Sequence, residues 1–249
     1  MKELPFGAAV YKQYKTTFLA SVIVGLKYSK VQDAEYHKEQ WDVYTRTMFN
    51  IPPLGGIFQK QLMINSNDGR LSYVFNDFQT MVRIAGNGYQ NFADTVIPQS
   101  YKLKQFVSDV VGSNKATSLG IRKVDVFQIE ADINKIGGED SVRRYFFSPE
   151  FINLDKPKAE LNEEERKMSN MIKYQWTEDD NTLTVRSVFL KDKNAENKYR
   201  LILDIDGQYT PIQGFELDQM EKILKEVNMD LYNAFMWCVN DNVKIIMER

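Results

Sequence analysis

The sequence predicts an α+β fold, in which a largely antiparallel β-sheet carries packed helices, including a long amphipathic helix near the C-terminus. Across residues 199–206, apolar and polar residues alternate with the period of two that marks a strand with one buried face. Across residues 217–239, apolar residues recur at three- and four-residue steps, which places them on one stripe of a helix. Because a long helix must bury such a stripe, the sheet that contains the preceding strand is its expected support.

The first half of the chain predicts strands and helices in an order unlike regular β-α-β repetition. Asn67-Asp68-Gly69 indicates a tight hairpin turn, and Pro98 predicts a kink or a break in the helix that contains it. The expected elements are a strand at residues 17–28, a helix at 32–49, strands at 57–65 and at 71–75 continuing into 79–84, a helix at 88–111, and a strand at 118–131.

The second half of the chain has a weak secondary-structure pattern at its start and a clear one after it. Residues 132–167 read as an irregular connection with a short helix, and their charge run at 160–167 favours a solvated segment. Strands at 168–177 and 182–191 follow, then the strand from Tyr199, which Gly207 is expected to end. We therefore expect an N-terminal α+β lobe at 1–131, a connection at 132–167 and a C-terminal lobe at 168–249, unless all three form one domain. No internal repeat of fixed period is visible.

The composition bounds the class of protein. The chain has 249 residues and a net charge of -2, which disfavours a chain-wide electrostatic grip on nucleic acid. Its one cysteine, Cys238, excludes an intramolecular disulfide and a cysteine-rich zinc site, and we expect a buried thiol there. No apolar run approaches the ~20 residues of a membrane span, and no signal peptide is recognised. We expect a cytoplasmic protein without a membrane partner.

Three aspartates offer one candidate for chemistry. Asp204 and Asp206 are two apart on one predicted strand and so share a face, while Asp125 lies in the middle of another strand. If those strands were neighbours, the three carboxylates would hold Mg²⁺ or Mn²⁺ for phosphodiester hydrolysis. The simpler alternative is that Asp206-Gly207 begins a turn and the face is solvated.

A second candidate combines cations with aromatic rings. Arg143 and Arg144 precede Tyr145-Phe146-Phe147, a mixture that would clamp and stack on nucleic acid. The ordinary alternative is an aromatic cluster in the core. Other catalytic sets are missing from the sequence. The one histidine, His37, falls on the polar side of its predicted helix, and there is neither a phosphate-binding loop nor a dinucleotide-binding glycine motif.

Three segments together resemble a known family. They are YKTTFLASVIVGLKY, LGIRKVDVFQI, and YRLILDIDG with the long helix that ends in NAFMWCVND. Their order and spacing resemble a family of similar length, sporadically distributed among bacteria, archaea and phages. In that family the middle strand typically reads G-L-R-Y-I-N-R-I: Gly120, Ile121 and Arg122 match, while Asp125 replaces the usual asparagine. The family's L-D-I-D strand is matched at residues 203–206.

The resemblance implies no active site, because that family has none assigned. Its sporadic distribution is similar to that of defence and mobile-element genes. We therefore expect a non-enzymatic protein that binds another protein, with no cofactor, in a bacterial defence or mobile-element system. The alternatives are a Mg²⁺- or Mn²⁺-dependent enzyme using Asp125, Asp204 and Asp206, and a nucleic-acid-binding module using Arg143 and Arg144.

Overall fold

A computed structural model describes residues 6–12, 14, 17–31, 57–58, 61–153, 171–192, 195 and 197–249. The helix expected at 32–49, with His37, lies outside these residues, as does the charge run at 160–167. In the described part, no helix is long and apolar enough to cross a membrane.

The expected α+β class is confirmed, and its centre is one antiparallel nine-stranded sheet. The strand order is β2-β3-β4-β5-β1-β7-β10-β9-β8. The bounds along the sheet are β2 (Ile57–Phe58), β3 (Gln61–Asn65), β4 (Leu71–Phe75), β5 (Gln79–Ala85), β1 (Leu19–Lys27), β7 (Ser118–Glu130), β10 (Lys198–Tyr209), β9 (Asn181–Lys191) and β8 (Met171–Glu178). A small second sheet pairs β6 (Lys115–Ala116) with β11 (Phe215–Glu216).

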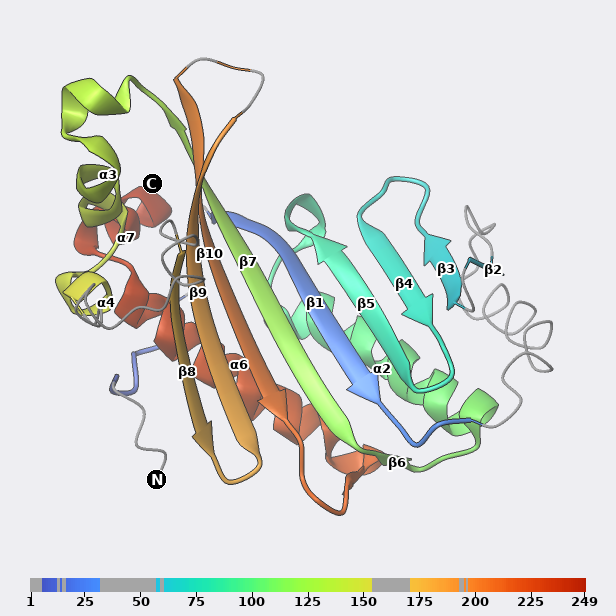
Figure 1. The fold of residues 1–249 in the computed structure, drawn as a ribbon. Coiled ribbons are helices and arrows are strands. Elements are labelled where there is room, and N and C mark those ends of the chain that lie inside the picture. Colours follow the sequence, from blue (N-terminus) through green and yellow to red (C-terminus); the bar gives the residue numbers. More distant parts are fainter. Residues whose placement is uncertain are drawn as a thin grey trace, which may run out of the picture.

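The helices gather on one face of the large sheet (Figure 1). Helix α2 contacts β1 and β5, and helix α6 contacts β7, β9 and β10. Helices α3, α4 and α7 continue this layer beside α6. The bounds are η1 (Gly86–Gly88), η2 (Phe92–Val96), α2 (Ile97–Phe106), η3 (Val107–Val111), η4 (Ile133–Ile136), α3 (Gly138–Phe146), α4 (Pro149–Asn153), η6 (Leu217–Gln219), α6 (Met220–Cys238) and α7 (Asp241–Glu248).

The long C-terminal helix is where the periodicity predicts it, as η6 followed by α6. Its stripe is buried on the sheet, as expected, at Leu217, Met220, Leu224, Val227 and Leu231. Cys238 at its end is fully buried and free, which confirms a thiol in the core. Burial raises the pKa of this thiol well above its usual value. It is therefore an inert core residue and no nucleophile.

Several expected boundaries are corrected. The strand expected to run from residues 71–75 into 79–84 is a hairpin of β4 and β5, because the Asn76 side chain accepts hydrogen bonds from the backbone N–H of Phe78 and Gln79 and closes a turn. The strand expected at 57–65 is the paired β2 and β3. The helix expected at 88–111 is η2, α2 and η3, with Pro98 in the first turn of α2, where proline is tolerated.

Gly207 does not end its strand, contrary to expectation, and β10 continues to Tyr209. A Cβ atom added at Gly207 would lie 2.4 Å from Leu231 Cδ1 and 2.8 Å from Val227 Cγ1 of α6. The glycine therefore lets α6 approach the sheet more closely than any side chain would permit.

The two halves of the sheet have the same plan. The first contains β1, β3, β4, β5 and α2, and the second contains β7, β8, β9, β10 and α6. In each half the first strand pairs with the last strand, and a helix on the same face follows. An approximate two-fold axis normal to the sheet therefore passes between the antiparallel strands β1 and β7. Because β7 pairs with both β1 and β10, the sheet runs unbroken across the expected lobe boundary.

We expect Gly207→Ala to lower the free energy of unfolding by about 1–3 kcal/mol, the usual cost of added volume in a packed core. Chemical denaturation of the purified protein measures this. The matched control is Gly120→Ala on the paired strand, where an added Cβ would be no closer than 3.5 Å to its neighbours. Equal denaturation midpoints for Gly207→Ala and the parent protein would contradict the close approach.

Candidate functional site

The three aspartates proposed as metal ligands do not share a face. In the register of β7 with β10, Asp125 pairs with Leu203, and Val124 pairs with Asp204. Neighbouring paired residues project to the same side, so Asp125 points toward the helices while Asp204 and Asp206 point away from them. Among the described residues, no group of three or more His, Cys, Asp or Glu side chains could hold a metal ion. The expected Mg²⁺ or Mn²⁺ site therefore lacks a common point of convergence.

Asp204 is instead the centre of an ion-pair network on the face without helices. Arg122 donates to both of its carboxylate oxygens at 2.8 Å, and Arg186 Nη1 lies 3.5 Å from Oδ2. The bidentate geometry fixes the Arg122 guanidinium, which still exposes 44% of its side chain. Asp206 accepts a hydrogen bond from Gln208 Nε2 at 3.0 Å, and burial raises the pKa of this carboxyl group.

Asp125 belongs to a buried polar cluster between the sheet and α6. Lys123 lies two residues before it on the same face of β7 and donates to Asn228 Oδ1 of α6 at 2.7 Å. Burial raises the pKa of Asp125 to about 7, and burial lowers the pKa of Lys123 to about 8, while each charge partly offsets the shift of the other. The negative charge of Asp125 also raises the pKa of Cys238 and the pKa of Tyr89.

The residues proposed to bind nucleic acid do not form one surface, because some are buried and others are exposed. Arg143 is buried, pairs with Glu139 at 2.7 Å and donates to Ser187 Oγ on β9. It therefore holds α3 against the sheet and is not available to a nucleic acid. Phe147 is also buried, whereas Arg144 and Tyr145 are exposed. The ordinary alternative, an aromatic cluster in the core, describes most of this segment.

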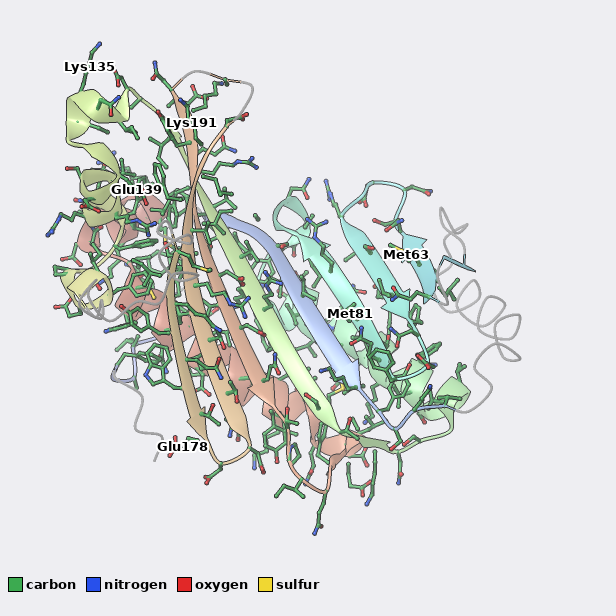
Figure 2. The ribbon with its side chains drawn as sticks, viewed as in Figure 1. Met63, Met81, Lys135, Glu139, Glu178 and Lys191 are labelled. Carbon is green, nitrogen blue, oxygen red and sulfur yellow. The ribbon has the colours of Figure 1, made fainter. Side chains whose placement is uncertain are left out.

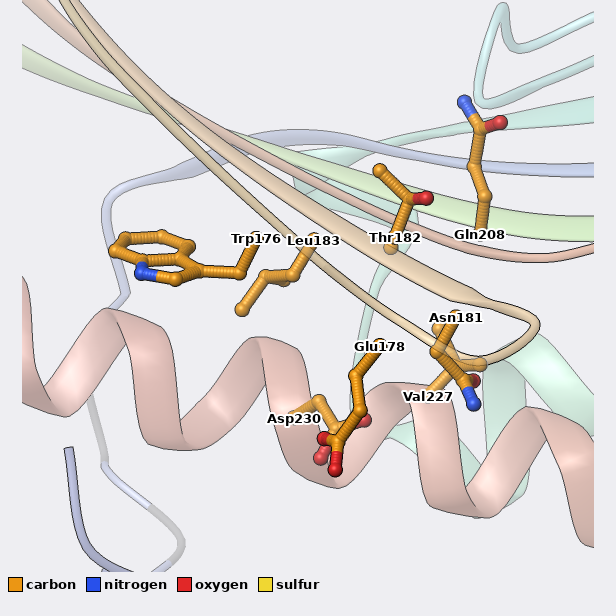
Figure 3. Close-up of a pocket in the computed structure, with 9 residues that line it drawn as sticks. Trp176, Glu178, Asn181, Thr182, Leu183, Gln208, Val227 and Asp230 are labelled. Atoms are coloured by element: carbon orange, nitrogen blue, oxygen red, sulfur yellow. The ribbon is translucent and has the colours of Figure 1, made fainter. Parts of the chain in front are cut away.

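A small recess of ≈ 20 Å³ lies where the β8–β9 hairpin meets α6. Glu178 from the end of β8 and Asp230 from α6 approach one another at its mouth (Figure 3). Trp176 also lines the recess, but its ring packs at 5.9 Å on both Phe6 and Trp237. Two carboxylates without a base or a third ligand do not define a catalytic or metal site.

The face of the sheet opposite α2 and α6, here called the open face, is a broad surface of the molecule. In the described part of the chain, no helix packs on it (Figure 1). Partly exposed apolar side chains run across it, including Met63 and Met81, which Figure 2 labels. The pairing places these apolar residues there: Ile23, Met63, Val74, Met81, Val124, Val126, Met171, Val188 and Ile202.

The open face also concentrates positive charge. Outside the Lys198–Glu130 ion pair, its only acidic residues are Asp204 and Asp206 among the described strands. The basic residues that the register places there outnumber them, whereas the whole chain has a net charge of -2. They are Lys27, Arg83, Arg122, Lys173, Arg186 and Arg200.

Compared with known proteins, the sequence matches no family model and no curated relative. The resemblance described above therefore stays a prediction. Sequence reasoning did not identify the open face. One signal for it was present: apolar residues occur at both odd and even positions of β1 and β7. The same pattern is typical of a strand that is buried on both faces.

We expect the stability of the parent protein to fall between about pH 4 and pH 7 through Asp125. Its folded pKa of about 7 exceeds its ordinary value of 3.8, so its stabilising contribution is complete below pH 3.8 and is lost as the pH rises through 7. Asp125→Asn removes this loss, and the unfolding free energy of the variant should rise relative to the parent over that window, by about 4 kcal/mol.

Denaturation of both proteins at several pH values measures the difference. Asp140→Asn, at an exposed position at the start of α3, is the control and should give a nearly flat difference. A flat difference for Asp125→Asn as well would show that the buried carboxyl group titrates normally.

Proposed function

We propose that this protein is a non-enzymatic binding protein whose open face docks a protein partner with an acidic surface. The observation that carries the proposal is a broad sheet face with apolar side chains and a surplus of positive charge that no described helix covers. Large apolar patches rimmed by polar residues are typical of interaction sites.

The size of the open face suits a stable complex. From β3 to β8 the sheet has eight strands, which at about 4.8 Å per strand span about 34 Å. The paired length of about five residues or more adds about 16 Å in the other direction. The product, about 500 Å² before side-chain relief is counted, approaches the ~800 Å² that each partner contributes to a standard interface.

The chemistry of the face favours an acidic protein over the other partners. Methionine and arginine are enriched at protein interfaces, and Met63, Met81, Arg83 and Arg122 all lie on this face. From β3 to β8 the described strands present no aromatic ring there for stacking on single-stranded bases. A second copy of the chain would place positive charge against positive charge.

The resemblance drawn from the sequence supplies the setting of this proposal, a cytoplasmic component of a bacterial defence or mobile-element system. Neither a cofactor nor a membrane enters it. The metal-dependent alternative loses support from the opposed faces of Asp125 and Asp204. The positive charge of the open face still supports the nucleic-acid alternative, and a crosslinking experiment distinguishes a nucleic acid from a protein partner.

A photo-crosslinking amino acid at position 81, on the open face, should capture one defined protein in cells that express the full chain. The same amino acid at position 229, exposed on the outer side of α6, is the matched control and should not capture it. Arg83→Glu should reduce the adduct at position 81 about tenfold, because it reverses a charge facing an acidic partner. Lys222→Glu, an exposed charge reversal on α6, should leave it unchanged.

Circular dichroism of each variant checks that it folds. Equal adducts at positions 81 and 229 would contradict the proposal, as would adducts insensitive to Arg83→Glu. An adduct that nuclease treatment removes would establish nucleic acid as the partner and would also contradict it.

A further inference from the structure

Two glycines pair with each other on the open face, in the two central strands of the sheet. Gly25 of β1 faces Gly120 of β7, near the end of β1 and the start of β7. Met81 on β5 pairs with Gly25, and Gln208 on β10 pairs with Gly120. The two glycines therefore leave a strip of backbone without side chains between Met81 and Gln208.

The fold itself does not require these glycines. A Cβ atom at Gly25 would meet Met81 Cγ at 3.6 Å, and one at Gly120 would meet Gln208 Cγ at 3.5 Å, both ordinary van der Waals contacts. Neither residue has a positive φ. Gly86 and Gly207 differ, because an added Cβ would lie 1.8 Å from Leu19 O at Gly86 and 2.4 Å from Leu231 at Gly207.

Glycine in the interior of a strand carries a cost, because it loses more conformational freedom on folding and packs no side chain. Two such glycines face each other in the two central strands, where substitution by a strand-forming residue would stabilise the sheet. A glycine inside a strand that the fold itself does not require often marks a place where another molecule approaches the backbone closely.

The surroundings define what would approach. Ile23 and Met81 provide apolar borders beside the glycines. A cation lies two residues after each glycine, Lys27 after Gly25 and Arg122 after Gly120, and the antiparallel pairing puts the two on opposite sides of the bare strip. The strip with these neighbours is here called the glycine patch.

We propose that the glycine patch is the anchor point of the open face, where a bulky apolar side chain of an acidic protein segment packs directly on the backbone of Gly25 and Gly120. Acidic residues of the same segment then meet Lys27 and Arg122. The inference rests on the proposed function and specifies it, since interfaces concentrate their binding energy in a few central, well-packed anchors.

The test uses Gly25→Val and Gly120→Val, each in the full chain with the photo-crosslinker at position 74, on the open face of β4 and outside the glycine patch. Valine suits a strand, so the thermal midpoint of each variant should equal or exceed that of the parent protein. The protein adduct at position 74 should fall about tenfold or more, the scale of a lost anchor. Ala85→Val, on the same face but away from the patch, should retain it.

Three results of this test would overturn the anchor proposal, and they differ in what they imply for the proposed function. Persistence of the adduct in both valine variants would overturn the anchor while leaving the proposed function intact. A thermal midpoint lowered by several degrees would show that the fold needs the glycines, which also overturns it. No adduct in the parent protein would overturn the proposed function and this inference together.

Discussion

The antiparallel pairing of β1 with β7 is the interaction on which the rest of the structure depends. It joins two halves of similar plan into one sheet, and its register decides which side chains face the helices. Because side chains alternate strictly along a strand, a slip of one residue would exchange the two faces. Val24 and Ile121 would then leave the core, and Gly25 and Gly120 would lie beneath the helices.

This register places the helices on one face of the sheet and leaves the apolar residues of the opposite, open face without helix cover in the described part of the chain. Helix α6 lies close to β10 because Gly207 presents no side chain, and Leu231 and Val227 occupy the space. The hydrophobic core therefore lies on this one side of the sheet, between the strands and the helices. The apolar residues on the open face gain little burial from the described part of the chain, so their burial by a partner would release further hydrophobic free energy.

The sequence predicted the fold class and most elements because those signals are local. The alternation in β10 and the stripe of α6 are both contained within one element. Relations between strands are not local, and these were missed. Nothing near Asp125 in the chain indicates that it faces α6 while Asp204 faces away, since that depends on pairing between residues far apart in sequence. The expectation of three converging carboxylates failed for this reason.

Residue type misled the site prediction in a similar way. Arg143 follows the pattern of a nucleic-acid contact, yet its guanidinium is buried against Glu139 and Ser187 and fastens α3 to the sheet. Lys123 and Asp125 also have the chemistry of a site, but Asp125 is buried and Lys123 is hydrogen-bonded to Asn228 of α6. A charged side chain inside the protein costs free energy unless it is paired, so such residues mark structural joints as readily as active sites.

Pairing between strands that are far apart in the chain explains why the two glycines escape notice in the sequence. The two halves of the sheet share a plan, but no repeat of fixed period is visible in the sequence. Each glycine looks unremarkable within its own strand. Only the pairing brings Gly25 and Gly120 together and sets Lys27 and Arg122 on opposite sides of them. Because the two glycines pair, the stretch of bare backbone is twice as wide as one glycine alone would leave, so two separate local features become one site on the surface.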